Sequence, residues 1–280
     1  MIGLEFLILP IAVALADAGS GARSILGFGA GAVVCYPQNE ACKKIIDFDA
    51  LQVVRYGLDP IQVLGVSDHG PESRLVALWQ SSALGKWDIV EKYSAEVVNA
   101  FAIGNEVATV NCKEKVCTIL VRRDGEELPF PLPDASPLFW RTKAFSWHHD
   151  SQSIIFPGPN DRILRIFLRD GATEEFATGT HSRLSTDGKK LAVLGRDRID
   201  VLDMNSGHAK AVAKGSMWKG SLNQVFFWSS EPSFLYVNYE SGYLGGDGYR
   251  CVRINLNYGR EEKLWTGPIA CSAEVITSSQ

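Results

Sequence analysis

The sequence lacks several features that would assign it to a common functional class. Its net charge is −4, and its Lys and Arg residues are spread along the chain rather than clustered. A surface for nucleic acid or for an anionic membrane needs clustered basic side chains, so neither partner is expected. No apolar run after residue 18 is long enough to cross a bilayer, and we expect no membrane-spanning segment.

Motifs for catalysis and for cofactor binding are missing as well. The G-x-S-x-G elbow of acyl-transfer enzymes and the S-x-D-x-G-x-T-W box of sialidases do not occur. The glycines at 27, 29 and 31 run into the apolar stretch 32–34, where a dinucleotide loop would need a helix. His148 and His149 are adjacent, so on an extended segment they point to opposite sides and do not converge on one metal. We expect no cofactor and no metal.

The first 18 residues are typical of an export signal. Residues 6–15 (FLILPIAVAL) form an apolar run too short to span a membrane, and Ala16-Asp17-Ala18 has the A-x-A form of a signal-peptidase site. The preceding MIGLE carries no basic residue, which departs from the usual signal, and a buried N-terminal strand or helix is the alternative. We expect residues 1–18 to be a signal peptide and residues 19–280 to form a single domain.

The six cysteines predict disulfides and an oxidising compartment. Cys35 and Cys42, and likewise Cys112 and Cys117, lie across short polar turns between strand-like runs, and facing residues of a hairpin come within disulfide reach. Zinc is the poorer interpretation, because no cluster of histidines accompanies the cysteine pairs as partnering ligands. Cys251 and Cys271 remain as a third pair. No Asn-x-Ser/Thr sequon occurs, which favours a periplasmic over a eukaryotic extracellular location.

An internal repeat predicts the fold. An apolar or Trp anchor is followed by an acid at +3 and by apolar residues at +7 and +9, which share one face of a strand. The pattern holds in WHHDSQSIIF (147–156), LSTDGKKLAV (184–193) and WSSEPSFLYV (228–237). The acid is expected to organise a turn by bonding its own backbone, so His148 to Asp150 is interpreted as a solvated turn.

Looser copies begin at Leu26, Val66 and Ile103, and the six anchors are 40, 37, 44, 37 and 44 residues apart. A period near 40 with several short strands per unit is typical of propeller blades. Cys35 and Cys112 each lie nine residues after an anchor, which suggests that they occupy equivalent positions. We therefore expect an all-β, six-bladed β-propeller with four-stranded antiparallel blades.

Residues 184–193 resemble the W-S-P-D-G-K-x-I-A-F repeat of TolB-type β-propellers, and residues 199–203 (IDVLD) are similar to the strand that follows it in that family. The resemblance is clearest over 147–237 and covers the first half of the chain only by spacing. It implies blades around a central axis and no particular function, since such propellers include binding scaffolds and non-catalytic domains of peptidases.

Loops on one rim are the expected recognition surface. Connections between blades and between second and third strands share that rim. It would carry both disulfide-linked hairpins, Cys35–Cys42 and Cys112–Cys117, and the segments 129–141, 214–224 and 239–248. The ligand-binding candidates there are exposed aromatic and charged residues, whose composition is typical of recognition surfaces: Trp140, Arg141, Trp218, Lys219, Tyr243 and Asp247. Burial of Trp140 and Trp218 between blades is the alternative.

We therefore expect an exported, monomeric, non-enzymatic protein of the periplasm or the extracellular space that binds a protein or glycan partner. A hydrolase or lyase with its active site at the central channel is the competing hypothesis. A His–carboxylate cluster in the channel would favour the enzyme, and an apolar-aromatic rim would favour binding.

Overall fold

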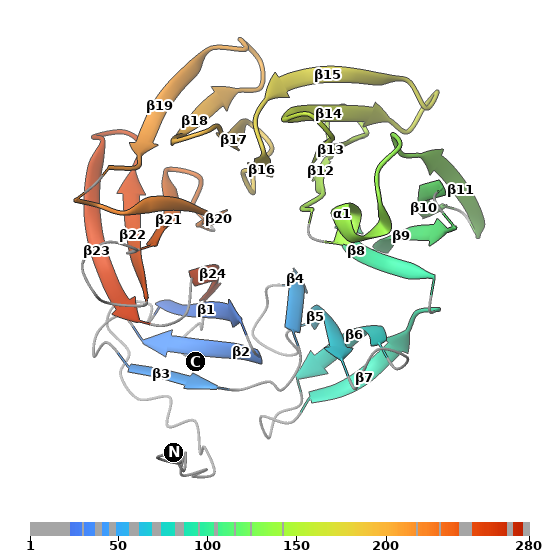
Figure 1. The fold of residues 1–280 in the computed structure, drawn as a ribbon, viewed down its shortest axis with the longest axis horizontal. Helices are drawn as coiled ribbons and strands as arrows, with labels where there is room; N and C mark the ends of the chain where they lie inside the picture. The colour runs from blue at the N-terminus through green and yellow to red at the C-terminus, as the bar shows by residue number, and fades with distance from the viewer. Residues whose placement is uncertain are drawn as a thin grey trace.

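The strands form a closed ring of six sheets (Figure 1). The computed structural model describes residues 23–276 apart from residues 30, 37–40, 45–48, 56–61, 69–73, 82–86, 95, 104–105, 115, 124, 142, 217, 230, 241–247 and 268–270. Within these residues each sheet has four antiparallel strands, with its first strand near the central axis and its fourth strand at the periphery. The predicted six-bladed propeller is confirmed.

The blades are numbered here along the chain. Blade 1 consists of β24 (Cys271–Ile276), β1 (Arg23–Gly29), β2 (Gly31–Tyr36) and β3 (Ala41–Lys44). Blade 2 consists of β4 (Asp49–Arg55), β5 (Gln62–Asp68), β6 (Arg74–Ser81) and β7 (Trp87–Lys92). Blade 3 consists of β8 (Val97–Ile103), β9 (Glu106–Lys113), β10 (Val116–Arg123) and β11 (Glu126–Pro131), and helix α1 (Pro137–Arg141) follows it.

The remaining blades contain the repeats that are clearest in the sequence. Blade 4 consists of β12 (Ser146–His148), β13 (Ser153–Pro157), β14 (Arg162–Phe167) and β15 (Thr173–Thr178). Blade 5 consists of β16 (His181–Leu184), β17 (Lys190–Leu194), β18 (Arg198–Asp203) and β19 (Ala209–Lys214). Blade 6 consists of β20 (Ser221–Trp228), β21 (Phe234–Glu240), β22 (Tyr249–Asn255) and β23 (Arg260–Gly267).

The composition of each strand follows its distance from the axis. In blade 4 every residue of the second strand β13 (SIIFP) is buried, because neighbouring blades cover both of its faces. The outermost strand β15 (TEEFAT) has mainly exposed residues, since one of its edges meets solvent. Apolar side chains of adjacent blades meet between the sheets, as where Phe145 stacks on Phe101 and on Phe156.

The residue after each of the three clear anchors, Trp147, Leu184 and Trp228, is a buried polar group that organises the turn. Ser185 donates to Asp187 at 2.6 Å and accepts from the Lys190 N–H, and Ser229 accepts from the backbone at Glu231. His148 stands at the same position and bonds through Nδ1 to the hydroxyl of Ser151. The predicted turn is confirmed, but His148 is only 8% exposed, so the interpretation as a solvated residue was wrong for it.

Two of the looser anchors lie on a different strand from the clear ones. Trp147, Leu184 and Trp228 belong to the innermost strands β12, β16 and β20. Leu26 and Val66 belong instead to β1 and β5, the second strands of their blades. The two cysteine hairpins are therefore not at equivalent positions in their blades. Cys35 and Cys42 face each other on β2 and β3, the third and fourth strands, whereas Cys112 and Cys117 face each other on β9 and β10, the second and third strands.

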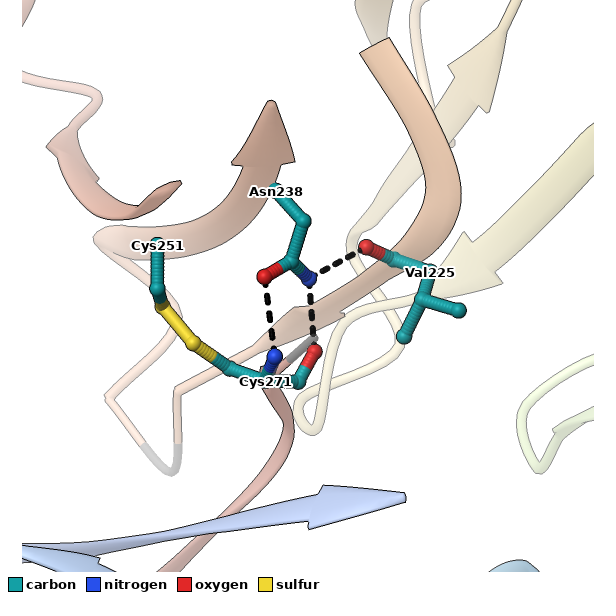
Figure 2. Close-up of a disulfide and its surroundings, with 4 residues drawn as sticks. All are labelled: Val225, Asn238, Cys251 and Cys271. Atoms are coloured by element: carbon teal, nitrogen blue, oxygen red, sulfur yellow. Dashed lines mark hydrogen bonds between the residues drawn. A yellow bond between two sulfur atoms is a disulfide. The ribbon is translucent and has the colours of Figure 1, made fainter. Parts of the chain in front are cut away.

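The last strand closes the ring. β24 pairs with β1, so blade 1 combines the two ends of the described chain. The Cys251–Cys271 disulfide connects β24 to β22 of blade 6, with both cysteines fully buried. Figure 2 shows a second fastening, in which Asn238 accepts from the Cys271 N–H at 2.8 Å and donates to the carbonyls of Cys271 at 2.6 Å and Val225 at 2.7 Å. A disulfide and a side-chain amide thus join the first and last blades.

The other cysteine predictions have separate outcomes. Cys112 and Cys117 form a disulfide with a Cα–Cα distance of 4.1 Å. Cys35 and Cys42 are direct partners in the β2–β3 pairing, while their side chains, like the expected signal peptide 1–18, lie outside the described part of the chain. None of the described helices is both long and apolar enough to span a bilayer.

Candidate functional site

The connections divide between two rims of the ring. Because consecutive strands are antiparallel, the connection between the second and third strands and the connection to the next blade leave from the same end of a blade. We call that end the inter-blade rim and the other end the opposite rim. The Cys112–Cys117 hairpin lies on the inter-blade rim, as predicted. The Cys35–Cys42 hairpin joins third and fourth strands, so the prediction that both hairpins share one rim was wrong.

The six ligand-binding candidates predicted from the sequence do not all lie on one described surface. Trp140 has no exposed surface and packs against Phe139, Phe145 and Phe156, so it belongs to the core and cannot contact a ligand. Its candidacy is corrected in favour of the alternative, burial between blades. Arg141 ends helix α1, and its side chain lies outside the described part of the chain. The residues Tyr243 and Asp247 also lie outside it, in the connection 241–247.

Trp218 is the candidate that the structure places in solvent. It lies in the connection between β19 and β20, and 83% of its surface is exposed. Ser216 and Gly220 close a tight turn around it through two backbone hydrogen bonds of 3.1 and 2.8 Å. Gly220 has φ +92°, a backbone conformation that favours glycine, and the Ser216 hydroxyl accepts from the Lys219 N–H at 3.0 Å. A turn that bonds to itself holds the indole outward.

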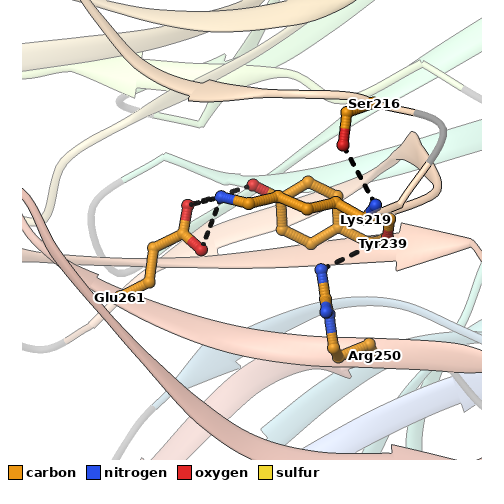
Figure 3. Close-up of polar contacts among 5 residues, drawn as sticks. All are labelled: Ser216, Lys219, Tyr239, Arg250 and Glu261. Atoms are coloured by element: carbon orange, nitrogen blue, oxygen red, sulfur yellow. Dashed lines mark hydrogen bonds and ion pairs between the residues drawn. The ribbon is translucent and has the colours of Figure 1, made fainter.

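A polar cluster fastens this turn to blade 6 (Figure 3). The Lys219 ammonium bonds to both carboxylate oxygens of Glu261 on β23, at 2.7 and 2.9 Å. The Tyr239 hydroxyl lies 3.4 Å from the same carboxylate, and the Lys219 ammonium lies 5.8 Å from the centre of the Tyr239 ring. The Lys219–Glu261 pair is only partly exposed, so solvent screens it less than an ordinary surface pair.

Arg250 completes the cluster from below the turn. It donates to the backbone carbonyl of Lys219 at 3.3 Å, and its guanidinium lies 5.1 Å from the centre of the Tyr239 ring. Burial and the nearby Glu261 carboxylate raise the pKa of Tyr239 to about 12, so its hydroxyl stays protonated and can donate. The three side chains of Lys219, Tyr239 and Arg250 therefore form a fixed base under an exposed Trp.

Glu261 and Arg250 were missed in the sequence. Both lie in strands, and a strand charge is most often simply solvated, so neither carries a local signal. They come together only through the blade: the pairing of β21 with β22 sets Tyr239 opposite Arg250, and the pairing of β22 with β23 adds the strand that carries Glu261. The pairing of β21 with β22 also sets Glu240 opposite Tyr249, next to Tyr239 and Arg250.

No family model matches the sequence, and neither does any curated protein. Many solved structures match the fold. TolB from Acinetobacter baumannii matches with a TM-score of 0.58 at 12% identity, over 90% of this chain and 67% of that one. A putative TolB from Agrobacterium tumefaciens matches with a TM-score of 0.57 at 12% identity, over 91% of this chain and 92% of that one. The chain has a TolB-like propeller fold.

The TolB-like ring is also similar to one in a nidogen/laminin complex, with a TM-score of 0.57 at 8% identity, over 92% of this chain and 99% of that one. Identities this low establish a shared fold and leave function to be argued from the site. Among the described residues of the TolB-like ring, no three His, Cys, Asp or Glu side chains come together in a way that could hold a metal ion. The site is therefore argued from the turn 216–220, which holds the exposed Trp218 and is bonded to itself and to blade 6.

Proposed function

We propose that this chain is an exported, monomeric, non-enzymatic β-propeller that binds a protein or glycan partner through its inter-blade rim, with Trp218 as the central contact. The observation that carries the proposal is an indole 83% exposed on a turn that is bonded to itself and to blade 6. Exposing so large an apolar group has a cost in solubility, and Trp is enriched among the residues that dominate binding energies.

Rigidity of the turn supports the same interpretation. Binding is weakened when a loop must be ordered as the partner arrives, and a loop held in place beforehand avoids that loss. The Ser216–Gly220 bonds and the Lys219–Glu261 ion pair hold this turn before any partner is present. An indole face also stacks on sugar rings and packs on apolar protein surface, which is why both partner classes remain within the proposal.

Export is proposed on the N-terminal signal and the disulfides. The Cys112–Cys117 and Cys251–Cys271 bonds would persist in an oxidising compartment and would be reduced in most cytoplasms. We expect the mature protein to begin at Gly19 and both disulfides to be found by non-reducing peptide mapping of exported material. An intact Met1 in a cytoplasmic fraction would rule out export.

The chain offers a matched control for the test of binding. Tyr258 is 84% exposed and belongs to the same blade, but its turn joins β22 to β23 and so lies on the opposite rim. A photo-crosslinking amino acid at position 218, in cells that export the protein, should capture a distinct protein, and the same residue at position 258 should not. For glycans, binding of labelled protein to an immobilised glycan panel should fall about 30-fold or more in Trp218→Ala, which corresponds to about 2 kcal/mol, and stay unchanged in Tyr258→Ala.

Each outcome decides between the alternatives. Capture at 218 alone identifies a protein partner, and glycan binding that depends on Trp218 identifies a sugar. Equal capture at both positions, or binding unaffected by Trp218→Ala, would remove Trp218 from the recognition surface and overturn the proposal.

A further inference from the structure

Three side chains at the turn between β12 and β13 form a chain of hydrogen bonds. The Nδ1 atom of His148 bonds to the Ser151 hydroxyl, and the Ser151 hydroxyl lies 2.6 Å from the Ser153 hydroxyl. Ser153 is fully buried, His148 is buried and Ser151 is half-buried. The turn joins the innermost strand of blade 4 to its second strand, so it lies on the opposite rim, close to the central axis. Ser151 is thus the most exposed member of the chain.

Burial decides the direction of the bond between the two serines. Within the described part of the chain, the Ser153 hydroxyl bonds to Ser151 alone. A hydroxyl carries one hydrogen, and a buried hydrogen without an acceptor is unfavourable, so the Ser153 hydroxyl donates to Ser151. A hydrogen bond donated to an oxygen stabilises negative charge on it, which makes the Ser151 hydroxyl easier to deprotonate.

The neighbouring blade sets the tautomer of His148. Its ring packs against the β16–β17 turn of blade 5, where a β-carbon on Gly188 would lie 3.4 Å from the ring Cδ2 and 3.7 Å from Nε2. The Gly188 N–H already donates to the Ser185 carbonyl at 2.9 Å, which leaves the Gly188 carbonyl as the group that can bond the ring. An acceptor beside Nε2 places the hydrogen of the neutral ring there, so Nδ1 accepts from the Ser151 hydroxyl.

The groups around His148 keep its ring neutral at pH 7. Burial and then Arg165 on β14 lower the pKa of His148, and His149 acts in the same direction, while Asp150 and the backbone bond at Gly188 oppose them. The neutral Nδ1 atom can therefore take up the proton of the hydroxyl to which it is bonded. The Gly188 carbonyl would stabilise the imidazolium that forms.

A base on one side of a hydroxyl and a hydrogen-bond donor on the other are the arrangement of an activated nucleophile. We propose that Ser151 is a reactive serine that takes an acyl group from an activated ester. The Ser151 oxygen attacks the ester carbonyl carbon, and its proton passes to Nδ1 of His148 and then to the departing alkoxide, which leaves as the alcohol. A new ester bond to Ser151 replaces the bond to the leaving group. This single transfer requires no turnover, and it takes place on the rim opposite Trp218, so it is independent of the proposed binding function.

The test treats the mature protein with p-nitrophenyl acetate, follows the release of p-nitrophenolate and locates the acetyl group by peptide mass spectrometry. A rapid release equal to the protein concentration is expected, with the acetyl group on Ser151. Because neutral His148 takes the proton, the rate in the wild type should rise with pH to a plateau, with its midpoint below the ordinary histidine pKa of 6.5. A hydroxyl without a base would instead react about tenfold faster with each pH unit and show no plateau near neutral pH.

Variants separate this site from ordinary surface acetylation. Ser151→Ala should abolish the rapid release, His148→Gln should slow it about 100-fold or more, and Ser153→Ala, which removes the buried donor, should slow it about tenfold. Ser206 is the matched control, an exposed serine of the same rim whose hydroxyl donates to the Asp203 carboxylate at 3.0 Å, and Ser206→Ala should leave the rate unchanged.

The pH profile of the wild type decides the question even if the buried variants fail to fold. Acetylation of Ser151 with a plateau supports the proposal. A protein that carries no acetyl group on Ser151, a rate without a plateau, or equal rates at Ser151 and Ser206 would overturn it.

Discussion

Replacing Asn238 by alanine should loosen the strand that closes the ring. The Asn238 side chain is fully buried, and its amide bonds to both backbone groups of Cys271 on β24 and to the carbonyl of Val225 on β20. One side chain thus bonds three backbone groups on two strands. Alanine leaves these groups inside the protein with no partner from residue 238.

The magnitude follows from those three groups. An unsatisfied buried donor or acceptor destabilises a fold by about 1–3 kcal/mol, and the effects of neighbouring groups do not add fully, so we expect a total of about 3–5 kcal/mol. For a domain of this size that corresponds to a fall in Tm of about 10 °C. Asn238→Asp should be no less damaging at neutral pH, because its carboxylate would face two carbonyl oxygens. Part of that loss should be recovered in acid, where a protonated carboxyl can donate once.

The disulfide provides a second arm of the test. Removing Cys251 and Cys271 together should destabilise the fold by about 3 kcal/mol in the chain-entropy model, since the bond closes a loop of 20 residues. Both fastenings hold the same strand, so their effects should be clearly non-additive in a double-mutant cycle. Urea denaturation and limited proteolysis of the C-terminal strand measure these changes. Asn205→Ala, in an exposed turn of blade 5, is the control, and a loss for Asn238→Ala within about 0.5 kcal/mol of that control would refute the role assigned to Asn238.

Two other predictions concern the repeat and the pH dependence of stability. Trp228 is buried and its indole N–H donates to the Arg183 carbonyl at 2.8 Å, so Trp228→Ala should destabilise the fold by about 3–5 kcal/mol. Asp150→Ala, in an exposed turn, should destabilise it by only about 0.5–1.5 kcal/mol. Equal losses of stability in thermal denaturation would contradict the repeat assignment. His181 has a folded-state pKa of about 4, below its unfolded value of about 6.5, so its stabilising contribution is present above pH 6.5 and is lost as the pH falls toward 4. Unfolding free energies measured across this range should fall less in His181→Gln than in the wild type, by on the order of 2–3 kcal/mol, and equal pH dependence would show that folding does not lower the pKa of His181.

The repeat was identifiable from the sequence where its turn carries both an anchor and an acid. In blades 4 to 6 the anchor, the acid and the two apolar positions fall on the innermost strand, the turn and the second strand, as expected. In blades 1 and 2 the assignment slipped by one strand, to Leu26 and Val66. Every inner hairpin of a blade has apolar residues on both sides of a turn, so spacing alone does not distinguish the first hairpin from the second.

Closure of the ring could not be predicted for a different reason. Pairing of β24 with β1 joins segments from opposite ends of the chain, and nothing in the local sequence records such a long-range contact. The pairing of Cys251 with Cys271 is similar, since the two residues lie in different blades and Asn238, which also holds β24, gives no sign of its role in the sequence. The even number of cysteines predicted a third disulfide, but it did not show that this disulfide joins the first and last blades.

Trp140 is buried and Trp218 is exposed, although the sequence analysis proposed both as ligand contacts. Both lie in connections between blades, and position along the repeat does not separate them. Trp140 has Phe139 and Phe145 close by, and the three aromatic rings pack together as core. Trp218 is followed by Lys219, whose ammonium reaches Glu261, and Gly220 supplies the positive φ of the tight turn. A basic residue follows both, so the distinction lies in the aromatic neighbours of Trp140 and in the glycine turn that carries Trp218.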